Sequence, residues 1–393
     1  MNKKIFTRIV FCIIFLSHKF IFSETFTWEK ILLETKTKNP TLIKSKQLLD
    51  QAEINYKILW SNFLPKITAS ADVTRSGNNS SSDEITRYSY GVSGRLTLFN
   101  GFGDMAQLQI KHIELQIAQE QFKRTYADII YNVKKSFINL LWAQKNVELA
   151  EKIYSRRKDN YELIKLRYEA GREDKGSLLK VEADLLNSEF ELKKAYRNKT
   201  VYLNQLLKDI GTESLKDIIV EGTFYTDKPD IVTTFLDLAK NTPEYKIAEL
   251  KLKKSEQEIV YAKSIFYPDL SLSVNISAFG TEFPLNSRNW SSGLELSFPL
   301  FSGRKNYYNY LLSEKNKIIQ EQSFNETKLQ LLSNLESVYN TLIDDYETIK
   351  IREKYLQASE EQTKITTLKY LNGLVSYYDW YSVENEYINA QKS

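Results

Sequence analysis

The stretch Leu98-Phe99-Asn100-Gly101 recurs 202 residues later as Leu300-Phe301-Ser302-Gly303. Three further landmarks recur at nearly the same spacing: Asn39-Pro40 with Thr242-Pro243, Leu64-Pro65 with Tyr267-Pro268, and Arg167–Gly171 with Lys369–Gly373. A repeat of this length is a duplicated half-protein rather than the short period of a solenoid. The sequence therefore predicts two copies of one structural unit.

The N-terminus has the pattern of a secretory signal peptide. Lys3 and Lys4 precede an apolar run over residues 9–16, and a polar chain follows. The run is shorter than the ~20 apolar residues that span a bilayer. We predict a signal peptide over residues 1–23, with a short N-terminal anchor as the alternative.

The composition of the remaining chain argues against an enzyme. It holds as many basic as acidic residues, which gives no reason to expect nucleic acid as a partner. Cys12 is the only cysteine and lies in the predicted signal peptide, and His112 is the only histidine beyond it. Disulfides, thiolate metal sites and histidine-pair chemistry are therefore not expected. We predict no catalytic residue, no metal site and no cofactor.

Two stretches, 105–210 and 305–393, contain no proline and almost no glycine. Apolar residues recur in them at steps of three and four, which indicates long helices packed as coiled coils. A helix from residue 105 to Gly171 would be roughly 100 Å long, too long to be buried in a compact domain. Gly171 and Gly373 are predicted to be the turns at the tips of two helical hairpins.

Between these arms, apolar and polar residues alternate with period two, which indicates strands. Polar loops are expected over Ser76–Thr86 and Gly280–Asn289. The predicted first repeat is 24–210, with helices over 27–63, strands 66–75 and 87–98, and a helical hairpin over 104–210. After a linker over 211–231, the second repeat is 232–393, with helices over 232–266, strands 269–279 and 290–299, and a hairpin over 304–393.

The strands permit two interpretations, an ordinary sheet on a core or a membrane barrel. In the barrel, the charged alternate positions would face a wet lumen: Asp72, Arg95, Asp269 and Glu295. Tyr88, Tyr90 and Trp290 would form a lipid-interface girdle, with ordinary sheet packing of these aromatics as the alternative. Four strands cannot close in lipid, so several chains would have to share one barrel; two, three or four copies would close.

The order, spacing and duplication of these motifs resemble the outer-membrane efflux protein family, the TolC-like channel-tunnels. The resemblance covers nearly all of the chain after residue 23. It implies a mainly α fold with a coiled-coil tunnel in the periplasm, and a homotrimer whose four strands per chain form a 12-stranded barrel in the lipid of the outer membrane. It also implies a periplasmic adaptor and an inner-membrane pump or ABC-type transporter as partners.

The resemblance further implies a closed tip that opens by rearrangement of its helices. Tyr370 and Asp379 match the family positions near the closed periplasmic entrance; the alternative for Asp379 is a solvated charge on a helix face. The chain departs from the family pattern at Val375 and Ser177. Arg172, Glu173 and Asp174 could form a different latch.

The function expected from the sequence is a passive exit duct for efflux or type I secretion, without catalytic chemistry. The alternative is a periplasmic or surface coiled-coil scaffold without a pore. The alternative accounts for the long helices but not for two amphipathic hairpins in register within a repeat.

Overall fold

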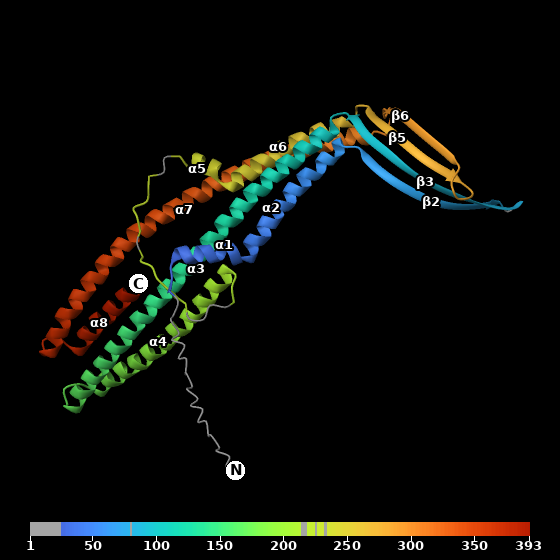
Figure 1. Ribbon diagram of the computed structural model, residues 1–393. Helices are drawn as coiled ribbons and strands as arrows, with labels where there is room; N and C mark the ends of the chain where they lie inside the picture. Colours follow the sequence, from blue (N-terminus) through green and yellow to red (C-terminus); the bar gives the residue numbers. More distant parts are fainter. Residues whose placement is uncertain (1–24, 79–80, 214–217, 225, 232–233) are drawn as a thin grey trace, which may run out of the picture.

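The computed structural model describes residues 25–393 apart from 79–80, 214–217, 225 and 232–233. The chain is elongated, with a curved sheet at one end and two helical hairpins at the other (Figure 1). The predicted signal peptide, residues 1–23, lies outside the described residues.

The two halves contain the same helices and strands in the same order, except that, among the described residues, a short 3-10 helix, η1 (Trp60–Phe63), is present only in the first half. The first half consists of α1 (Trp28–Lys38), α2 (Pro40–Leu59), η1 (Trp60–Phe63), β2 (Lys66–Asn78), β3 (Ser81–Asn100), α3 (Gly103–Glu169) and α4 (Lys175–Ile210). The second consists of α5 (Phe235–Asn241), α6 (Pro243–Ser264), β5 (Asp269–Gly280), β6 (Ser287–Ser297), α7 (Lys305–Leu371) and α8 (Tyr377–Lys392).

The helices predicted over 27–63 and 232–266 are each divided in the structure. Asn39 and Thr242 adopt extended backbone, and a proline follows each as the first helical residue. The Asn39 side chain accepts from the Leu42 N–H at 2.9 Å, and the Thr242 hydroxyl accepts from the Tyr245 N–H at 3.3 Å. Since an N-cap with proline at the next position starts a new helix, the chain bends at both positions.

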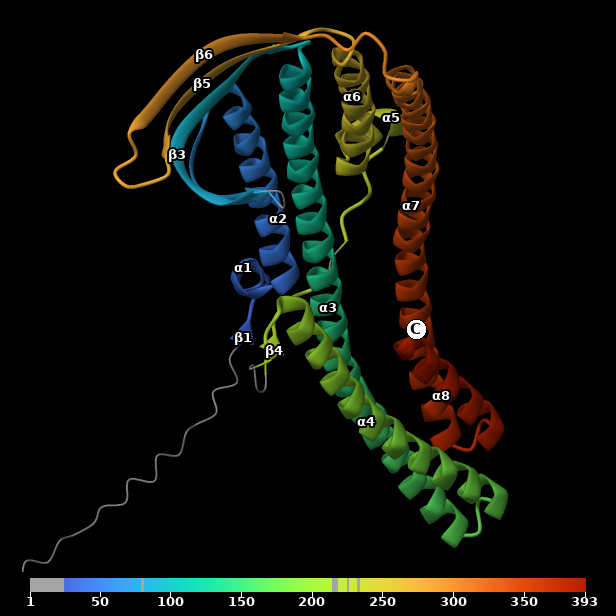
Figure 2. The same ribbon diagram turned by 90° about the vertical axis from the view of Figure 1, so that its right-hand side faces the viewer.

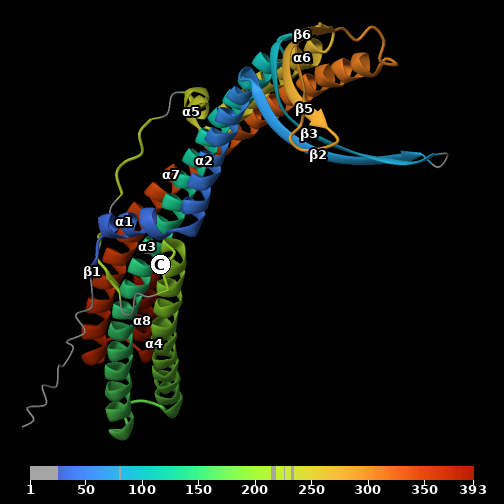
Figure 3. The same ribbon diagram turned by 45° about the vertical axis from the view of Figure 1, so that its right-hand side comes forward.

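The four strands form one antiparallel sheet of order β2-β3-β5-β6. The two β-hairpins, β2–β3 and β5–β6, have the same register. Lys66 pairs with Arg95, and the equivalent residues of the second repeat, Asp269 and Ser297, also pair. Figure 3 shows the sheet curving away beyond the end of the long helices.

The predicted polar loop over Ser76–Thr86 is wrong. β2 continues to Asn78 and β3 begins at Ser81, with Arg75 paired with Thr86 and Ser76 with Ile85. Ladder hydrogen bonds join backbone groups, so polar side chains do not end a strand when both faces remain accessible to solvent. In the second hairpin, β6 begins at Ser287 rather than 290 and ends at Ser297 rather than 299, where Pro299 lacks an N–H for the ladder.

The long helices lie side by side in the order α2, α3, α6, α7 (Figure 2). α3 and α7 contain 67 residues each, which is about 100 Å of helix. α4 returns along α3 for 36 residues, whereas α8 returns along α7 for 16. No helix in the described ranges combines the length and the apolar character that a membrane crossing requires.

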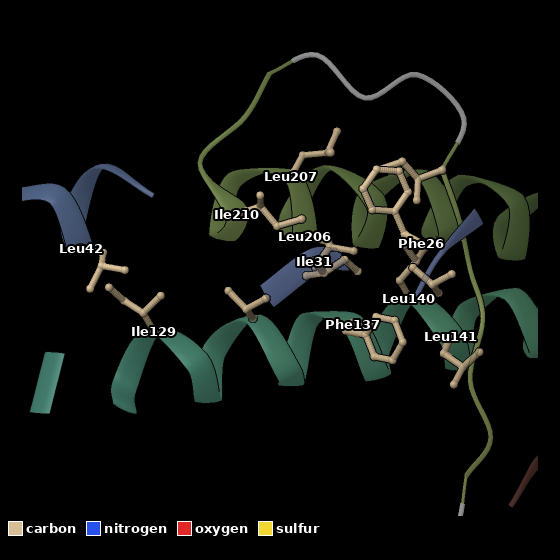
Figure 4. Packing of buried hydrophobic residues seen from close by; sticks show 13 residues of the cluster. Phe26, Ile31, Leu42, Ile129, Phe137, Leu140, Leu141, Leu206, Leu207 and Ile210 are labelled. Carbon is tan, nitrogen blue, oxygen red and sulfur yellow. The ribbon is translucent and has the colours of Figure 1, made fainter. Parts of the chain in front are cut away.

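The largest hydrophobic cluster lies at mid-height, where α1, α3 and α4 meet (Figure 4). Ile31, Leu140 and Leu206 are fully buried in it. A small parallel sheet of β1 (Thr25–Phe26) and β4 (Ile219–Val220) covers this cluster. The Gln144 carboxamide donates to the Val220 carbonyl at 2.9 Å and accepts from the Val220 N–H at 3.0 Å. The segment predicted as a linker over 211–231 therefore contains a strand that the sequence pattern did not reveal.

Candidate functional site: a two-faced sheet and a helical tip

One face of the sheet carries the charged positions singled out in the sequence. The register places Arg95 beside Ser273, Glu295 beside Ser271, and Asp269 beside Ser297, all on the same face. On this face the Arg95 guanidinium donates to the Ser271 hydroxyl at 3.2 Å and to the Glu295 carboxylate at 3.3 Å. Asp72, opposite Ser89, belongs to the same face nearer the outer end.

The opposite face is apolar and exposed. Leu272, next to Leu96 and Leu294, belongs to it, and its neighbours on this face are largely solvent-accessible in the single chain: Ile67 73%, Val73 68%, Tyr90 50%, Ile276 60%, Trp290 78%, Leu294 68% and Leu296 69%. Exposing this much contiguous apolar surface to water is unfavourable, so the face is built for an apolar environment. The two faces together have the alternation of a membrane β-barrel wall.

Tyr88 and Tyr90 lie in the middle of β3 rather than near its end. The sequence placed them near a strand end because it missed the extension of β3 to Ser81. Tyr88 pairs with Gly280, the last residue of β5, so it does mark the outer limit of the four-stranded part of the sheet. Its ring contacts Phe283 of the β5–β6 loop at 5.1 Å between centroids.

At the other end of the molecule, both hairpins turn through a left-handed glycine. Gly171 has φ +69° and Gly373 has φ +75°. The N–H of Arg172 donates to the Arg167 carbonyl at 2.8 Å, and the N–H of Leu374 donates to the Lys369 carbonyl at 2.9 Å. These bonds are those of a glycine C-terminal helix cap, which fits a reversal of chain direction at each tip.

Tyr370 joins the two hairpins at the tip. It is 2% exposed and packs with Ile164, Val181 and Trp380 in a cluster drawn from α3, α4, α7 and α8. Its ring stacks on Trp380 with 4.8 Å between centroids and an interplanar angle of 12°. Its hydroxyl donates to Glu173, and burial together with this hydrogen bond raises the pKa of Tyr370 to about 12.

Arg167, in the last turn of α3, also contacts Tyr370. Its guanidinium lies 4.3 Å from the centre of the Tyr370 ring, a cation–π contact. It also donates to the Tyr370 carbonyl at 3.3 Å, at the C-terminus of α7. A cation at this helix end is stabilised by the free carbonyl groups.

Asp379 has a helix-capping role in this structure. It is the third residue of α8, and its carboxylate accepts from the Ser376 hydroxyl at 2.7 Å and from the Ser376 N–H at 3.3 Å. The Asp379 N–H in turn donates to the Ser376 hydroxyl at 3.2 Å, which completes a capping box. The Asp379 carboxylate therefore stabilises the first turn of α8 within a single chain.

Two of the residues suggested for a different latch have partners at the tip. Glu173 accepts from Tyr370, whereas Asp174 caps α4 by accepting from the Ser177 N–H at 2.9 Å. Ser177 is buried, and Val375 packs against the cluster around Tyr370.

Further contacts between α8 and the first hairpin were missed in the sequence. Glu384, which is 1% exposed, accepts from two guanidinium nitrogens of Arg156, one of them at 2.7 Å, and from the Asn160 amide at 3.2 Å. The Tyr381 hydroxyl donates to Asp184 at 2.7 Å. The paired partners are about two hundred residues apart in the chain, so no local pattern could have revealed them.

Among the described residues, no group of three or more His, Cys, Asp or Glu side chains has a metal-binding arrangement. The candidate site consists of the two-faced sheet and the network of side-chain contacts at the helical tip.

Comparison with known proteins identifies the fold and the family. The profile of the family described as outer membrane efflux protein matches residues 32–212 and 237–393, one segment in each repeat. The chain belongs to the outer membrane efflux protein family. This confirms the resemblance, the fold class and the outer-membrane location predicted from the sequence.

Individual relatives are distant but extend over most of the chain. Nodulation protein T of Rhizobium leguminosarum bv. trifolii is 22% identical over 352 residues, covering 84% of this chain and 73% of its own length. The crystal structure of CusC, described in connection with transmembrane channel formation, superposes with a TM-score of 0.83 at 17% identity, over 93% of this chain and 86% of that one. The open state of the MtrE outer membrane channel of Neisseria gonorrhoeae gives a TM-score of 0.81 at 18% identity, over 93% and 84%.

Proposed function

We propose that three copies of this chain form a passive outer-membrane exit duct, supplied by a periplasmic adaptor and an inner-membrane pump. The observation that carries the proposal is the sheet, which has one exposed apolar face and one polar face, and whose outer strands β2 and β6 each have one free edge among the described residues. An open sheet edge in lipid leaves backbone groups without partners, so the strands must close with those of other copies. Three copies give twelve strands, in agreement with what the family resemblance implies.

Transport through such a duct needs no chemistry of its own. Asp72, Arg95, Asp269 and Glu295 would line the lumen, while Tyr88, Tyr90 and Trp290 would face lipid near its boundary. The helices continue the duct toward the periplasm, and the driving energy comes from the pump.

Control of the duct is proposed to reside at the tip. Tyr370 is held by Glu173, Arg167 and Trp380, and α8 is held to α3 by Arg156 and Glu384. These contacts join the α7–α8 hairpin to the α3–α4 hairpin, so their loss would let α7–α8 move outward. Asp379 enters the gate through its capping of α8, which places the first turn of this helix.

The duct is tested with purified protein in detergent and in planar bilayers. The expected result is a trimer by native mass spectrometry and stepwise conductance in bilayers. A water-soluble monomer without conductance would overturn the proposal and favour the scaffold alternative. Crosslinking in cells identifies the adaptor, which separates small-molecule efflux from type I protein secretion.

The tip is tested by Tyr370→Phe, which removes only the hydroxyl that binds Glu173. The matched control is Tyr355→Phe, because Tyr355 lies on the same helix and is 65% exposed. Tyr370→Phe should increase single-channel conductance or open probability, and the control should not. Identical traces for the wild type and Tyr370→Phe would remove Tyr370 from the gate.

A further inference from the structure

In the part of the chain that the structure describes, β2 and β6 each have a partner on one side only, and the internal repeat indicates how their free edges pair. β2 and β5 are equivalent strands of the two repeats, as are β3 and β6. The pairing of Lys66 with Arg95 recurs between their equivalents Asp269 and Ser297, so this equivalence holds residue by residue. The junction β3–β5, where one repeat meets the other, is therefore a template for a junction between β6 of one copy and β2 of the next.

We propose that β6 pairs with β2 of the next copy in the register of the β3–β5 junction, which places Glu295 opposite Asp72 of the next copy. This inference rests on the shared barrel proposed above. In the template, Arg95 pairs with Ser273 and Ser93 with Asn275. When each residue is replaced by its equivalent in the other repeat, Ser297 pairs with Ser70 and Glu295 pairs with Asp72. We call this junction between β6 of one copy and β2 of the next the seam.

The proposed register keeps both faces of the sheet continuous. The pairs that face the lumen are Ser297 with Ser70 and Glu295 with Asp72, and all four residues are polar. The pairs that alternate with them are Leu296 with Ala71 and Leu294 with Val73, all apolar. A slip by one residue would place Leu296 or Leu294 opposite Asp72. One strand would then turn its apolar side chains to the lumen while the other turned them to the lipid, which is unfavourable.

A glycine below the sheet fits the same junction between copies. Gly101 has φ +64°, and a Cβ added to it would lie 2.3 Å from the Ser264 carbonyl oxygen and 2.7 Å from the Tyr267 Cβ. Gly303, its equivalent, has φ +62° and nothing within 4 Å. In the seam, the residues equivalent to Ser264 and Tyr267 are Ser61 and Leu64 of the next copy, so the close contact made by Gly101 within the chain would be made by Gly303 between copies.

The seam also creates a cluster of charges in the lumen. Two carboxylates directly opposite each other on antiparallel strands are destabilising. The Arg95 guanidinium lies 3.3 Å from Glu295 and supplies the opposite charge from two strands away. The cluster therefore consists of Arg95 and Glu295 of one copy with Asp72 of the next, and Arg95 offsets the repulsion between the carboxylates.

The experiment uses cysteine pairs, since the only natural cysteine, Cys12, lies in the predicted signal peptide. Ser297→Cys is combined in turn with a cysteine at 66, 68, 70, 72 or 74, all on the lumen face. Directly opposite residues have Cβ atoms about 5 Å apart, whereas residues shifted by two have Cα atoms about 7–8 Å apart. The larger separation is near or beyond the Cα–Cα distance of ~7 Å above which a disulfide does not form. Crosslinked dimers and trimers should be several-fold more abundant for Ser70→Cys with Ser297→Cys than for any other pair, and each single cysteine should give none.

The outcomes separate the seam from the duct. A maximum at another position, or a conducting trimer with no crosslink at any position, overturns the seam and leaves the duct standing. A monomer without conductance overturns the duct itself. As a second measurement, Gly303→Ala should reduce the disulfide crosslink between Ser70→Cys and Ser297→Cys. The control Gly373→Ala, at a glycine with φ +75° and nothing within 4 Å, should not reduce it. Equal crosslink yields in both variants count against the seam.

Discussion

Replacing Arg156 by methionine should release α8 from the first hairpin, because Arg156 neutralises a buried carboxylate. Glu384 is 1% exposed, whereas the Arg156 side chain is 37% exposed. Removing the arginine leaves the carboxylate buried, and among the described residues its remaining polar partner is the Asn160 amide at 3.2 Å. Losing one partner of a buried ion pair costs about 3–5 kcal/mol, and the lower end applies here because the amide remains.

The two partners should not be equivalent. Glu384→Gln leaves Arg156 accessible to water, so its cost should be about 1.5 kcal/mol, that of one charged hydrogen bond. At about 1.4 kcal/mol per factor of ten, the opening of α8 should become roughly 150-fold more frequent in Arg156→Met and roughly tenfold more frequent in Glu384→Gln. The double variant Arg156→Met with Glu384→Met should recover most of the loss, because apolar residues can replace a buried pair at little cost.

The assay is hydrogen exchange of the amides of α8, measured by mass spectrometry on the purified trimer. The control is Lys364→Met, which breaks an exposed pair with Glu360 at 3.0 Å and should change exchange by less than about threefold. Equal exchange rates in the two single variants, or a double variant that exchanges faster than both, would show that the burial of Glu384 does not set the cost of losing Arg156.

Three further predictions concern the tip, the junction below the sheet and the mid-height core. The tip should loosen at high pH: since the pKa of Tyr370 is about 12 in the folded chain and about 10 when unfolded, its contribution is complete below pH ~10 and is lost as the pH rises through ~12. Trp380 fluorescence that stays pH-independent over this range, or changes equally in Tyr370→Phe, would contradict this. Gly101→Ala should destabilise the chain by about 2 kcal/mol or more because its Cβ would meet the Ser264 carbonyl oxygen at 2.3 Å, whereas Gly94→Ala, with nothing within 4 Å, should cost less than about 1 kcal/mol in thermal unfolding. Gln144→Leu should cost about 1–3 kcal/mol by leaving both backbone groups of Val220 without their side-chain partner, and unchanged exchange of the Val220 amide would refute this.

Local patterns in the chain were sufficient for much of the fold. The period-two alternation around Ile67 and Val274 predicts strands, and the register then shows which residues share a face. The polar stretch from Ser76 to Thr86 was misread because alternation reports burial, while the strand is held by its backbone ladder. One local signal went unused: Ser376 followed three residues later by Asp379 is a capping-box pattern, and it predicts that the aspartate caps α8.

The duplication, the long helices, the turns at the two tips and the two-faced strands can be predicted from the amino-acid sequence, because each depends on residues close together in the chain or on spacing that recurs. Three contacts become visible only in the folded chain: Tyr370 with Glu173, Arg156 with Glu384, and β4 with β1. The residues in each of these contacts lie about two hundred positions apart in the chain, and the folding of the long helices brings them together. Such contacts cannot be predicted from the sequence, because a charged group or a hydroxyl has many possible partners in the chain and only the packing of the helices brings one of them within reach.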